Sequence, residues 1–269
     1  NRQQLLIISG ILSIDASTQN VYHFSDTDKN ISLLDISETF GTYDGSFVLY
    51  DNNLDSWKIY DLEEATKRIP PESTYKIYDA LLGLESGIIT PEHSSMTWNG
   101  DAFPFPSWEA DQDLNSAMQN SVNWYFQAID SQLGINRVQE FLNKIEYGNQ
   151  TTSSNLDLYW SDFSLKISPL EQVTLLKKFN TNEFHLNSQN VFSVKNAIKI
   201  ASTPNGNFYG KTGTGRVNGQ DINGWFIGYV ETSDNSYYFA TNIQSDSNAT
   251  GKKAFEITSD ILKKLHIWN

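Results

Sequence analysis

The chain has 269 residues, with 32 acidic and 19 basic side chains and a formal net charge of −13 at pH 7. This length supports one large domain with a substantial core, and the negative charge argues against nucleic-acid binding, which needs clustered lysine and arginine. The sequence contains no cysteine, so disulfides, thiolate metal sites and cysteine nucleophiles are excluded.

Histidine is too scattered to build a catalytic or metal site. None of the four histidines stands at metal-ligand spacing or in a candidate catalytic motif: His23, His93, His185 and His266. We therefore predict no metal site, and the sequence argues against a Ser-His-Asp triad. Any general base must then be another residue type.

The N-terminal segment is expected to be an arm or linker, over residues 1–37, ahead of a domain formed by residues 38–269. The chain begins with Asn1, which indicates a processed chain or a fragment. The run Leu5–Ile14 is mostly apolar but only half of the roughly 20 residues that a membrane span needs. It predicts either a buried strand or helix, or the end of a membrane segment.

Strands are expected near both ends of the chain. Two hairpins are predicted by pairs of apolar runs around Asn/Asp turns, 46–50 with 57–60 and 225–230 with 237–243. A terminal helix is predicted by one apolar stripe, Ala254, Ile257, Ile261 and Leu265.

The middle of the chain is expected to be largely helical, over residues 109–202, with a further helix that runs from Pro70-Pro71 to Ser86 and ends at Gly87. Ser168-Pro169-Leu170-Glu171 has the cap, proline and glutamate of a helix start. Two further helical segments are predicted, one over 137–145 and one with the apolar period Val191, Val194, Ile198 and Ala201.

The element order predicts an α/β (α+β) fold. An antiparallel sheet is built from both chain ends, about 38–70 and 205–269, and a helical subdomain of about 71–204 is inserted between them. Such a layout creates a cleft at the seam, a common place for ligand sites.

The first candidate motif is Ser73-Thr-Tyr-Lys76, at the start of the predicted helix. Positions three apart share a helix face, so the Ser73 hydroxyl and the Lys76 amine can meet. A desolvated lysine can act as the base that makes serine a nucleophile, and a helix N-terminus stabilises an oxyanion. Taken alone the motif is also compatible with an exposed helix face.

Two further motifs could complete a cleft. In Lys211-Thr-Gly-Thr-Gly215 the small residues allow a ligand to lie against a strand, and the N–H of Thr214 could complete an oxyanion hole; the alternative is a glycine-rich turn. Ser121-Val-Asn123 could present a hydroxyl and an amide if the helix breaks there, the alternative being a polar pair within a helix.

The order of these motifs, with Tyr147-Gly-Asn149 as a fourth, is more specific than any one of them. The composite resembles the penicillin-recognising serine enzymes, over about residues 38–266. Three details resemble the class D β-lactamase branch: Tyr147–Asn149, Tyr159-Trp160 and Leu165–Pro169. Within that branch four segments resemble the BlaR/MecR signal-transducing penicillin receptors: 73–78, 119–125, 209–215 and 223–229.

The resemblance implies acylation of Ser73 by the carbonyl of a β-lactam. It implies that Lys76 is the base, N-carboxylated by carbon dioxide and supported by Trp160, with no other cofactor. A free lysine has a pKa near 10.4, which burial must lower before the amine can capture carbon dioxide. The resemblance also assigns Ser121 as a proton relay to the β-lactam nitrogen and Lys211, Thr212 and Thr214 as contacts of the antibiotic's carboxylate.

The resemblance leaves two functions open, which differ at deacylation. A receptor must keep its acyl group, whereas a class D β-lactamase keeps its base and turns over. The hydrolases of this branch usually have an apolar residue at the position of Asn123. An amide carbonyl here could bond the ammonium form of Lys76 and trap the acyl-protein, so we expect a β-lactam sensor, with the hydrolase as the alternative.

Partners and location follow from the receptor resemblance. We expect covalent binding of β-lactam antibiotics, no nucleic acid, and contact with a membrane only through a full-length receptor, on its extracellular face. A secreted protein is the alternative. A transpeptidase or carboxypeptidase, against which Tyr147–Asn149 and Trp160 argue, and a non-covalent binding module are the remaining readings.

Overall fold

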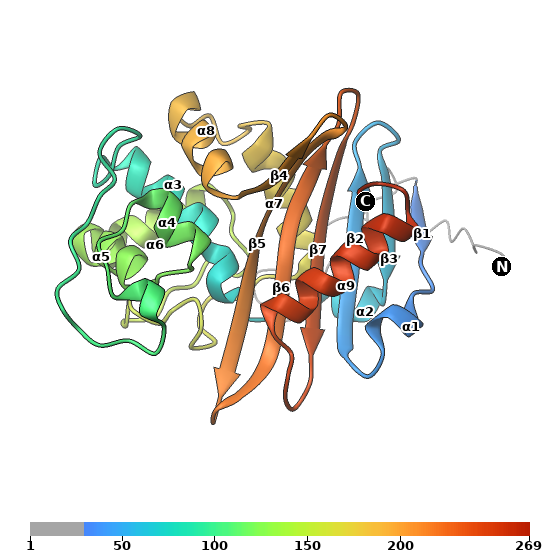
Figure 1. Ribbon diagram of the computed structural model, residues 1–269, viewed down its shortest axis with the longest axis horizontal. Coiled ribbons are helices and arrows are strands. Elements are labelled where there is room, and N and C mark those ends of the chain that lie inside the picture. Colours follow the sequence, from blue (N-terminus) through green and yellow to red (C-terminus); the bar gives the residue numbers. More distant parts are fainter. Residues whose placement is uncertain (1–29) are drawn as a thin grey trace.

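The computed structural model describes residues 30–269, and the predicted run Leu5–Ile14 lies outside the described residues. Within this range seven strands form one sheet, in the order β1-β3-β2-β7-β6-β5-β4 (Figure 1). The strands are β1 (Ile31–Leu33), β2 (Asp44–Asp51), β3 (Ser56–Tyr60), β4 (Lys199–Thr203), β5 (Gly206–Val217), β6 (Gln220–Glu231) and β7 (Ser236–Gln244).

The helices lie mainly between β3 and β4 in the sequence. They are α1 (Ser37–Phe40), α2 (Leu62–Thr66), α3 (Lys76–Glu85), α4 (Leu114–Gln119), α5 (Asn123–Leu133), α6 (Ile135–Lys144), α7 (Pro169–Asn180), α8 (Ser188–Ala197) and α9 (Gly251–Lys264). Two short 3₁₀ helices are η1 (Glu72–Tyr75) and η2 (Pro106–Trp108). None of the helices in residues 30–269 is long and apolar enough to cross a membrane.

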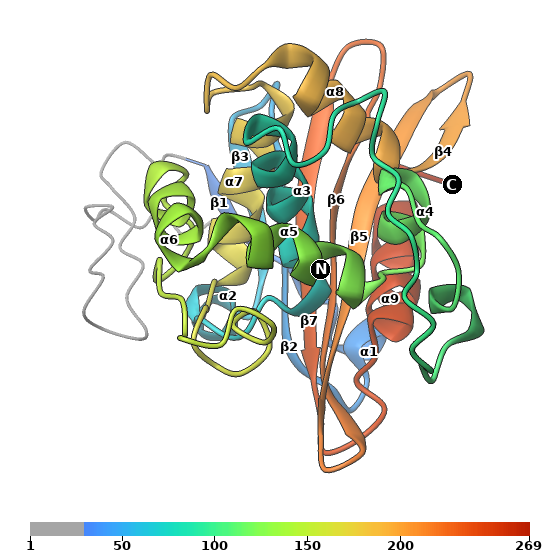
Figure 2. The same ribbon diagram turned by 90° about the vertical axis from the view of Figure 1, so that its left-hand side faces the viewer.

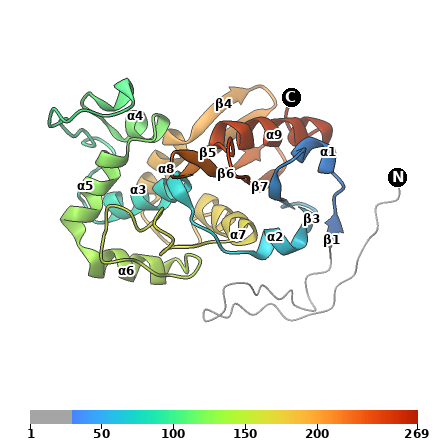
Figure 3. The same ribbon diagram turned by 90° about the horizontal axis from the view of Figure 1, so that it is seen from below.

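The sheet is covered on both faces, which explains the nearly continuous apolar sequence of β6 (Figure 3). Alternate residues point to opposite faces of a strand. Trp225 and Tyr229 accordingly belong to the larger core on the side of α7, while Phe226 and Val230 belong to a second core with Ile257 of α9. The strand therefore separates two hydrophobic cores.

Both predicted hairpins are confirmed, and they pair with each other at the centre of the sheet. β2 pairs antiparallel with β3 and with β7, so Phe47 lies opposite Thr241. The one parallel pairing within the described residues joins β1 to β3. β1 lies within the segment that was predicted to be an arm. Ile31–Leu33 are instead part of the sheet, where they pair with β3. The two chain ends thus build one sheet, as expected.

The predicted start of α7 is confirmed, but the predicted end of another helix was wrong. Ser168 and Glu171 form the expected capping box at α7. The helical period was predicted to reach Ala201, whereas α8 ends at Ala197 and Ala201 lies in β4. The two-residue turn Pro204-Asn205 explains the difference, because it folds β4 back onto β5 and gives this polar segment a ladder of hydrogen bonds.

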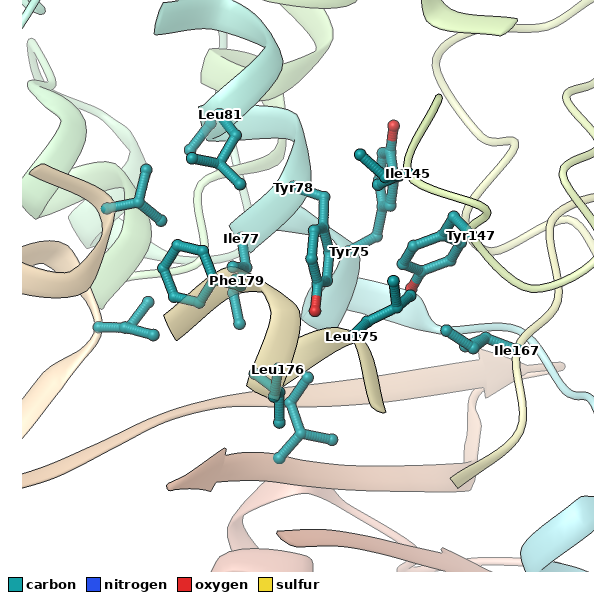
Figure 4. Close-up of a cluster of buried hydrophobic side chains, with 14 of the residues drawn as sticks. Tyr75, Ile77, Tyr78, Leu81, Ile145, Tyr147, Ile167, Leu175, Leu176 and Phe179 are labelled. Atoms are coloured by element: carbon teal, nitrogen blue, oxygen red, sulfur yellow. The ribbon is translucent and has the colours of Figure 1, made fainter. Parts of the chain in front are cut away.

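The inserted helices pack around α3, in front of the sheet in Figure 2. Figure 4 shows Tyr78 of α3 between Phe179 of α7 and Tyr147 from the turn after α6, with ring centroids at 6.5 and 5.3 Å. Because all three rings are buried, they fix α3, which begins at Lys76 and directly follows the 3₁₀ helix that contains Ser73.

Candidate active site

Ser73 lies in η1, directly before α3, and its backbone is held in a strained geometry. The preceding residue, Glu72, has a φ of 52°, in the left-handed region that non-glycine residues seldom adopt. The Glu72 N–H donates to the Trp160 carbonyl at 3.0 Å, and the Pro70 carbonyl accepts from the Trp225 indole at 2.8 Å. These bonds orient the Ser73 backbone toward the cleft.

Lys76 is buried beside the serine hydroxyl. The residue is only 1% exposed. Its Nζ lies 2.7 Å from Ser73 Oγ and 2.6 Å from Asn123 Oδ1. Burial, and secondarily the positive charge of Lys211, hold the pKa of Lys76 well below its usual range. The structure therefore brings a serine hydroxyl against an amine whose neutral form is favoured, as a nucleophile and base require.

Two aromatic rings lie over the Lys76 amine. The centroids of Phe126 and Trp160 are each 5.7 Å from Nζ. Trp160 also stacks on Tyr75 of η1 at 6.2 Å. Two aromatic rings thus lie close to the amine and help to desolvate it.

Ser121 and Asn123 come from the break between α4 and α5 that the sequence suggested. Ser121 has a φ of 53° in this break, and Asn123 is the first residue of α5. Lys211 Nζ lies 3.0 Å from Ser121 Oγ and also donates to the Thr212 carbonyl at 3.0 Å. Burial lowers the pKa of Lys211 to about 7.

The Lys211–Gly215 motif forms the part of β5 beside Ser73, in which Thr214 is exposed and Lys211 is buried. A Cβ on Gly213 would lie 3.2 Å from the Ser73 nitrogen, so glycine permits this close approach. The Thr214 hydroxyl accepts a hydrogen bond from the Gly251 N–H at 2.9 Å, which ties the strand to α9. Thr212 is half-buried and faces the cleft. The oxyanion role of the Thr214 N–H stays a prediction.

Ser73, Ser121, Asn123, Thr212 and Thr214 line one cleft of about 330 Å³. Its wall also contains an aromatic group that the motifs did not include: Phe105, which is 53% exposed, packs on Trp108 at 5.1 Å. The lining residues are Ser73, Phe105, Ser107, Trp108, Asn120, Ser121, Asn123, Thr212, Gly213 and Thr214. The cleft combines an apolar wall with convergent polar groups, as small-molecule sites do.

Tyr147-Gly148-Asn149 has a structural role at the base of the loop that carries Trp160. The Asn149 side chain donates to the Ser164 carbonyl at 2.7 Å and accepts from the Lys166 N–H at 2.9 Å. Its backbone N–H donates to the Lys166 carbonyl at 2.9 Å. The motif thus closes the loop between residues 149 and 166 and fixes Trp160 indirectly.

A Gly148→Ala variant is expected to lose about 2 to 3 kcal/mol of unfolding free energy. Gly148 has a φ of 50°, and a Cβ there would lie 1.9 Å from the Lys166 carbonyl oxygen. Urea unfolding measures the loss. Gly87→Ala is the matched control, because its φ of 72° is also positive but its Cβ would meet no atom within 4 Å. Equal losses in both variants would contradict the predicted clash.

Glu72 is a buried acid behind the nucleophile. Its residue is 6% exposed, Asn223 donates to its Oε1 at 3.4 Å, and a Cβ on Gly215 would lie 2.4 Å from the same oxygen. Burial raises the pKa of Glu72 to about 8, against the opposing effects of Asn223 and Lys76.

Glu72→Gln is expected to stabilise the protein increasingly as the pH rises. The folded-state pKa of Glu72, about 8, is above the ordinary glutamic acid value of 4.5. The stability that protonated Glu72 contributes is therefore fully present below pH 4.5 and is lost as the pH rises toward 8. Glu72→Gln should match the parent at acidic pH and exceed it by up to about 4 kcal/mol in mildly alkaline buffer. Denaturant unfolding across this window tests it, with exposed Glu92→Gln as control; parallel pH curves for parent and Glu72→Gln would refute it.

Sequence reasoning missed several residues of the site. Phe126 follows Asn123 by three positions on a helix, and that spacing could have identified it. Glu72 and Asn223 carried no such signal, because their proximity depends on how the sheet packs against the turn before Ser73.

The comparisons with known proteins agree with the resemblance seen in the sequence. Residues 26–263 match the family described as penicillin binding protein transpeptidase domain. The chain is 40% identical to the methicillin resistance mecR1 protein of Staphylococcus aureus over 98% of its own length, but it spans only 44% of that protein.

Two solved structures extend the comparison. The C-terminal domain of the Bacillus licheniformis BlaR penicillin-receptor is 46% identical, with a TM-score of 0.87 over 89% of this chain and 98% of that one. A class D β-lactamase from Bacillus subtilis is 36% identical, with a TM-score of 0.82 over 88% and 97% of the two chains. Both the predicted fold and the predicted kinship are confirmed.

Proposed function

The chain belongs to the penicillin-binding protein transpeptidase family and has BlaR and mecR1 among its relatives, and from this premise we propose that it is the β-lactam-sensing domain of a membrane receptor. The observation that carries the proposal is the position of Lys76 Nζ, between Ser73 Oγ and Asn123 Oδ1 at 2.7 and 2.6 Å. We infer from the same relatives that the domain faces the outside of the cell.

Acylation would begin with attack of Ser73 Oγ on the lactam carbonyl carbon, while Lys76 removes the hydroxyl proton. The carbonyl oxygen becomes an oxyanion near the N–H groups of Ser73 and Thr214. The lactam C–N bond then breaks, and Ser121, bonded to Lys211 at 3.0 Å, delivers a proton to the nitrogen. The product is an ester of Ser73.

Binding of the antibiotic's carboxylate falls to Lys211, Thr212 and Thr214 of β5. Lys211 contributes positive charge when protonated, and the hydroxyls of Thr212 and Thr214 donate hydrogen bonds. The aromatic wall of Phe105 and Trp108 provides apolar contact for the remainder of the ligand.

The residues around Lys76 fit its N-carboxylation. A neutral amine is required for that reaction, and burial favours the neutral form of Lys76. The carbamate made from carbon dioxide would supply a negatively charged base at neutral pH, and Trp160 and Phe126 would keep water away from it.

Asn123 distinguishes a receptor from a hydrolase in this proposal. Its Oδ1 accepts a hydrogen bond from Lys76 Nζ, and an ammonium is a stronger, charge-assisted donor to an amide oxygen than the single N–H of a carbamate. The contact therefore favours the decarboxylated lysine after acylation. Without a base to activate water, the ester persists and the signal lasts.

The test is the lifetime of the acyl-protein. One equivalent of benzylpenicillin is mixed with the protein, and its intact mass is followed over several hours. We expect one adduct that forms quickly and persists. An adduct that disappears within seconds while penicillin is consumed would overturn the sensor function. It would identify the protein as a class D β-lactamase, like the Bacillus subtilis enzyme of similar fold. No adduct at all would overturn both.

A further inference from the structure

Two carboxylic acids that the mechanism does not use lie in the core behind Lys76. Asp79 of α3 and Asp130 of α5 are both fully buried. Among residues 30–269, neither oxygen of Asp79 nor Oδ1 of Asp130 has a hydrogen-bond partner apart from the carboxyl group of the other acid. The Tyr159 hydroxyl donates to Asp130 Oδ2 at 2.9 Å. Buried polar groups with so few partners require an explanation.

A proton shared between the two acids supplies that explanation. Burial raises the pKa of Asp79 and Asp130, repulsion between them raises that of Asp79 further, and the two carboxyl groups contact each other through a hydrogen bond. Two carboxylates in direct contact repel each other, so one proton stays on the pair, whereas the pKa of Asp130, raised to about 7, lets the other proton leave around neutral pH.

The two acids lie on the same helices as two of the site residues, deeper in the core. Asp79 is three residues after Lys76 on α3, and Asp130 is seven residues after Asn123 on α5, so each acid lies on the helix face of its site residue. Tyr159 directly precedes Trp160, and their rings pack at 5.1 Å. The three segments around the Lys76 amine therefore also meet at the acid pair.

We propose that the Asp79–Asp130 pair is a positioning site for the sensor reaction: its negative charge is a buried counter-charge of Lys76 and shifts that lysine toward the ammonium form. This proposal rests on the sensor function above. Carbamate formation needs the neutral amine, whose nitrogen bonds the carbon of carbon dioxide while one proton leaves to solvent. A counter-charge that favours the ammonium opposes this step and prolongs the acyl-protein.

Other charged or titratable groups near the pair come from the elements packed against it. Tyr75 lies on η1, while Asp157 and Tyr159 belong to the loop that carries Trp160. Lys211 acts on Lys76 in the opposite direction, because its positive charge favours the neutral amine. Glu72 of η1 acts in the same direction as the acid pair. Burial and Lys211 therefore favour the neutral amine of Lys76, whereas the acid pair and Glu72 favour the ammonium.

The test compares variants that differ in the number of negative charges buried near Lys76. Asp79→Asn removes the shared proton but leaves Asp130 as a carboxylate, so one negative charge remains. The double variant Asp79→Asn/Asp130→Asn removes that charge and keeps two side chains of the same size. Asp51→Asn is the control, because Asp51 is a buried acid in the β2–β3 hairpin that accepts from Asn235 at 2.9 Å.

Isotope-labelled bicarbonate is added to each free protein, and the lysine carbamate is followed by NMR. The double variant should need about tenfold less bicarbonate for half-carboxylation, since one unit charge a helical turn away acts through a protein interior. Its acyl-protein with benzylpenicillin should also be shorter-lived. Asp79→Asn alone and Asp51→Asn should stay within about twofold of the parent. An unchanged bicarbonate requirement in the double variant would overturn the proposal.

A second measurement decides the matter if the double variant does not fold. Infrared spectroscopy at neutral pH should show a protonated carboxyl band that Asp79→Asn removes, distinct from the band of Glu72, which Glu72→Gln removes. Loss of no band in Asp79→Asn would refute the shared proton. Both measurements use the free protein, so they remain decisive even if benzylpenicillin forms no adduct and the sensor function itself fails.

Discussion

Ser73→Ala is expected to abolish covalent labelling by benzylpenicillin. Ser73 supplies the hydroxyl that lies 2.7 Å from the buried Lys76 amine, and alanine cannot form the ester. Nucleophile and base together account for most of the rate of such reactions, so labelling should fall by at least about a thousandfold. Intact-mass spectrometry over several hours measures it.

The matched control is Ser107→Ala, a serine that lines the same cleft. It should be labelled at the parent rate. Labelling of Ser73→Ala at that rate would show that another residue is the nucleophile, and peptide mapping of the adduct would identify it. Unfolding curves for both variants confirm that the fold is intact.

Asn123→Val is expected to shorten the acyl-protein lifetime by about a hundredfold or more. Valine removes the oxygen that lies 2.6 Å from Lys76 Nζ, so the ammonium loses an acceptor and the neutral, carboxylated lysine is favoured. A base then remains after acylation and can activate water. The lifetime is measured by mass spectrometry after excess penicillin has been removed.

Asn120→Val supplies the comparison for that variant, because Asn120 also lines the cleft but makes no contact with Lys76 among those that the structure describes. It should leave the lifetime unchanged. If Asn123→Val keeps the parent lifetime, Asn123 has no part in trapping, and the acid pair would be the remaining means of restraining Lys76.

The sequence predicted the elements of the fold and which motifs would meet. Turn residues, caps and apolar periods are local signals, so both hairpins and the start of α7 could be read directly. The motif order added long-range information, and the structure does bring Ser73, Lys76 and Asn123 within hydrogen-bonding distance. Their chemical roles remain predictions.

What could not be predicted depends on contacts between distant segments. The end of α8 was misplaced because pairing of β4 with β5 overrides the helical period through Ala201. Glu72 and Asp130 look like ordinary surface acids in the sequence. Only the packing of β5 and the Trp160 loop against them shows that they are buried.

The sheet built from both chain ends has a consequence for how the protein matures. Phe47 pairs with Thr241, and Ser121 bonds Lys211 across the cleft, so loops of great length must close before the site exists. A chain still lacking β7 during synthesis would have the serine and lysine but no completed sheet to hold them. Reaction with penicillin is therefore a probe of complete folding. During refolding, the ability to be labelled by penicillin should recover more slowly than the helix content.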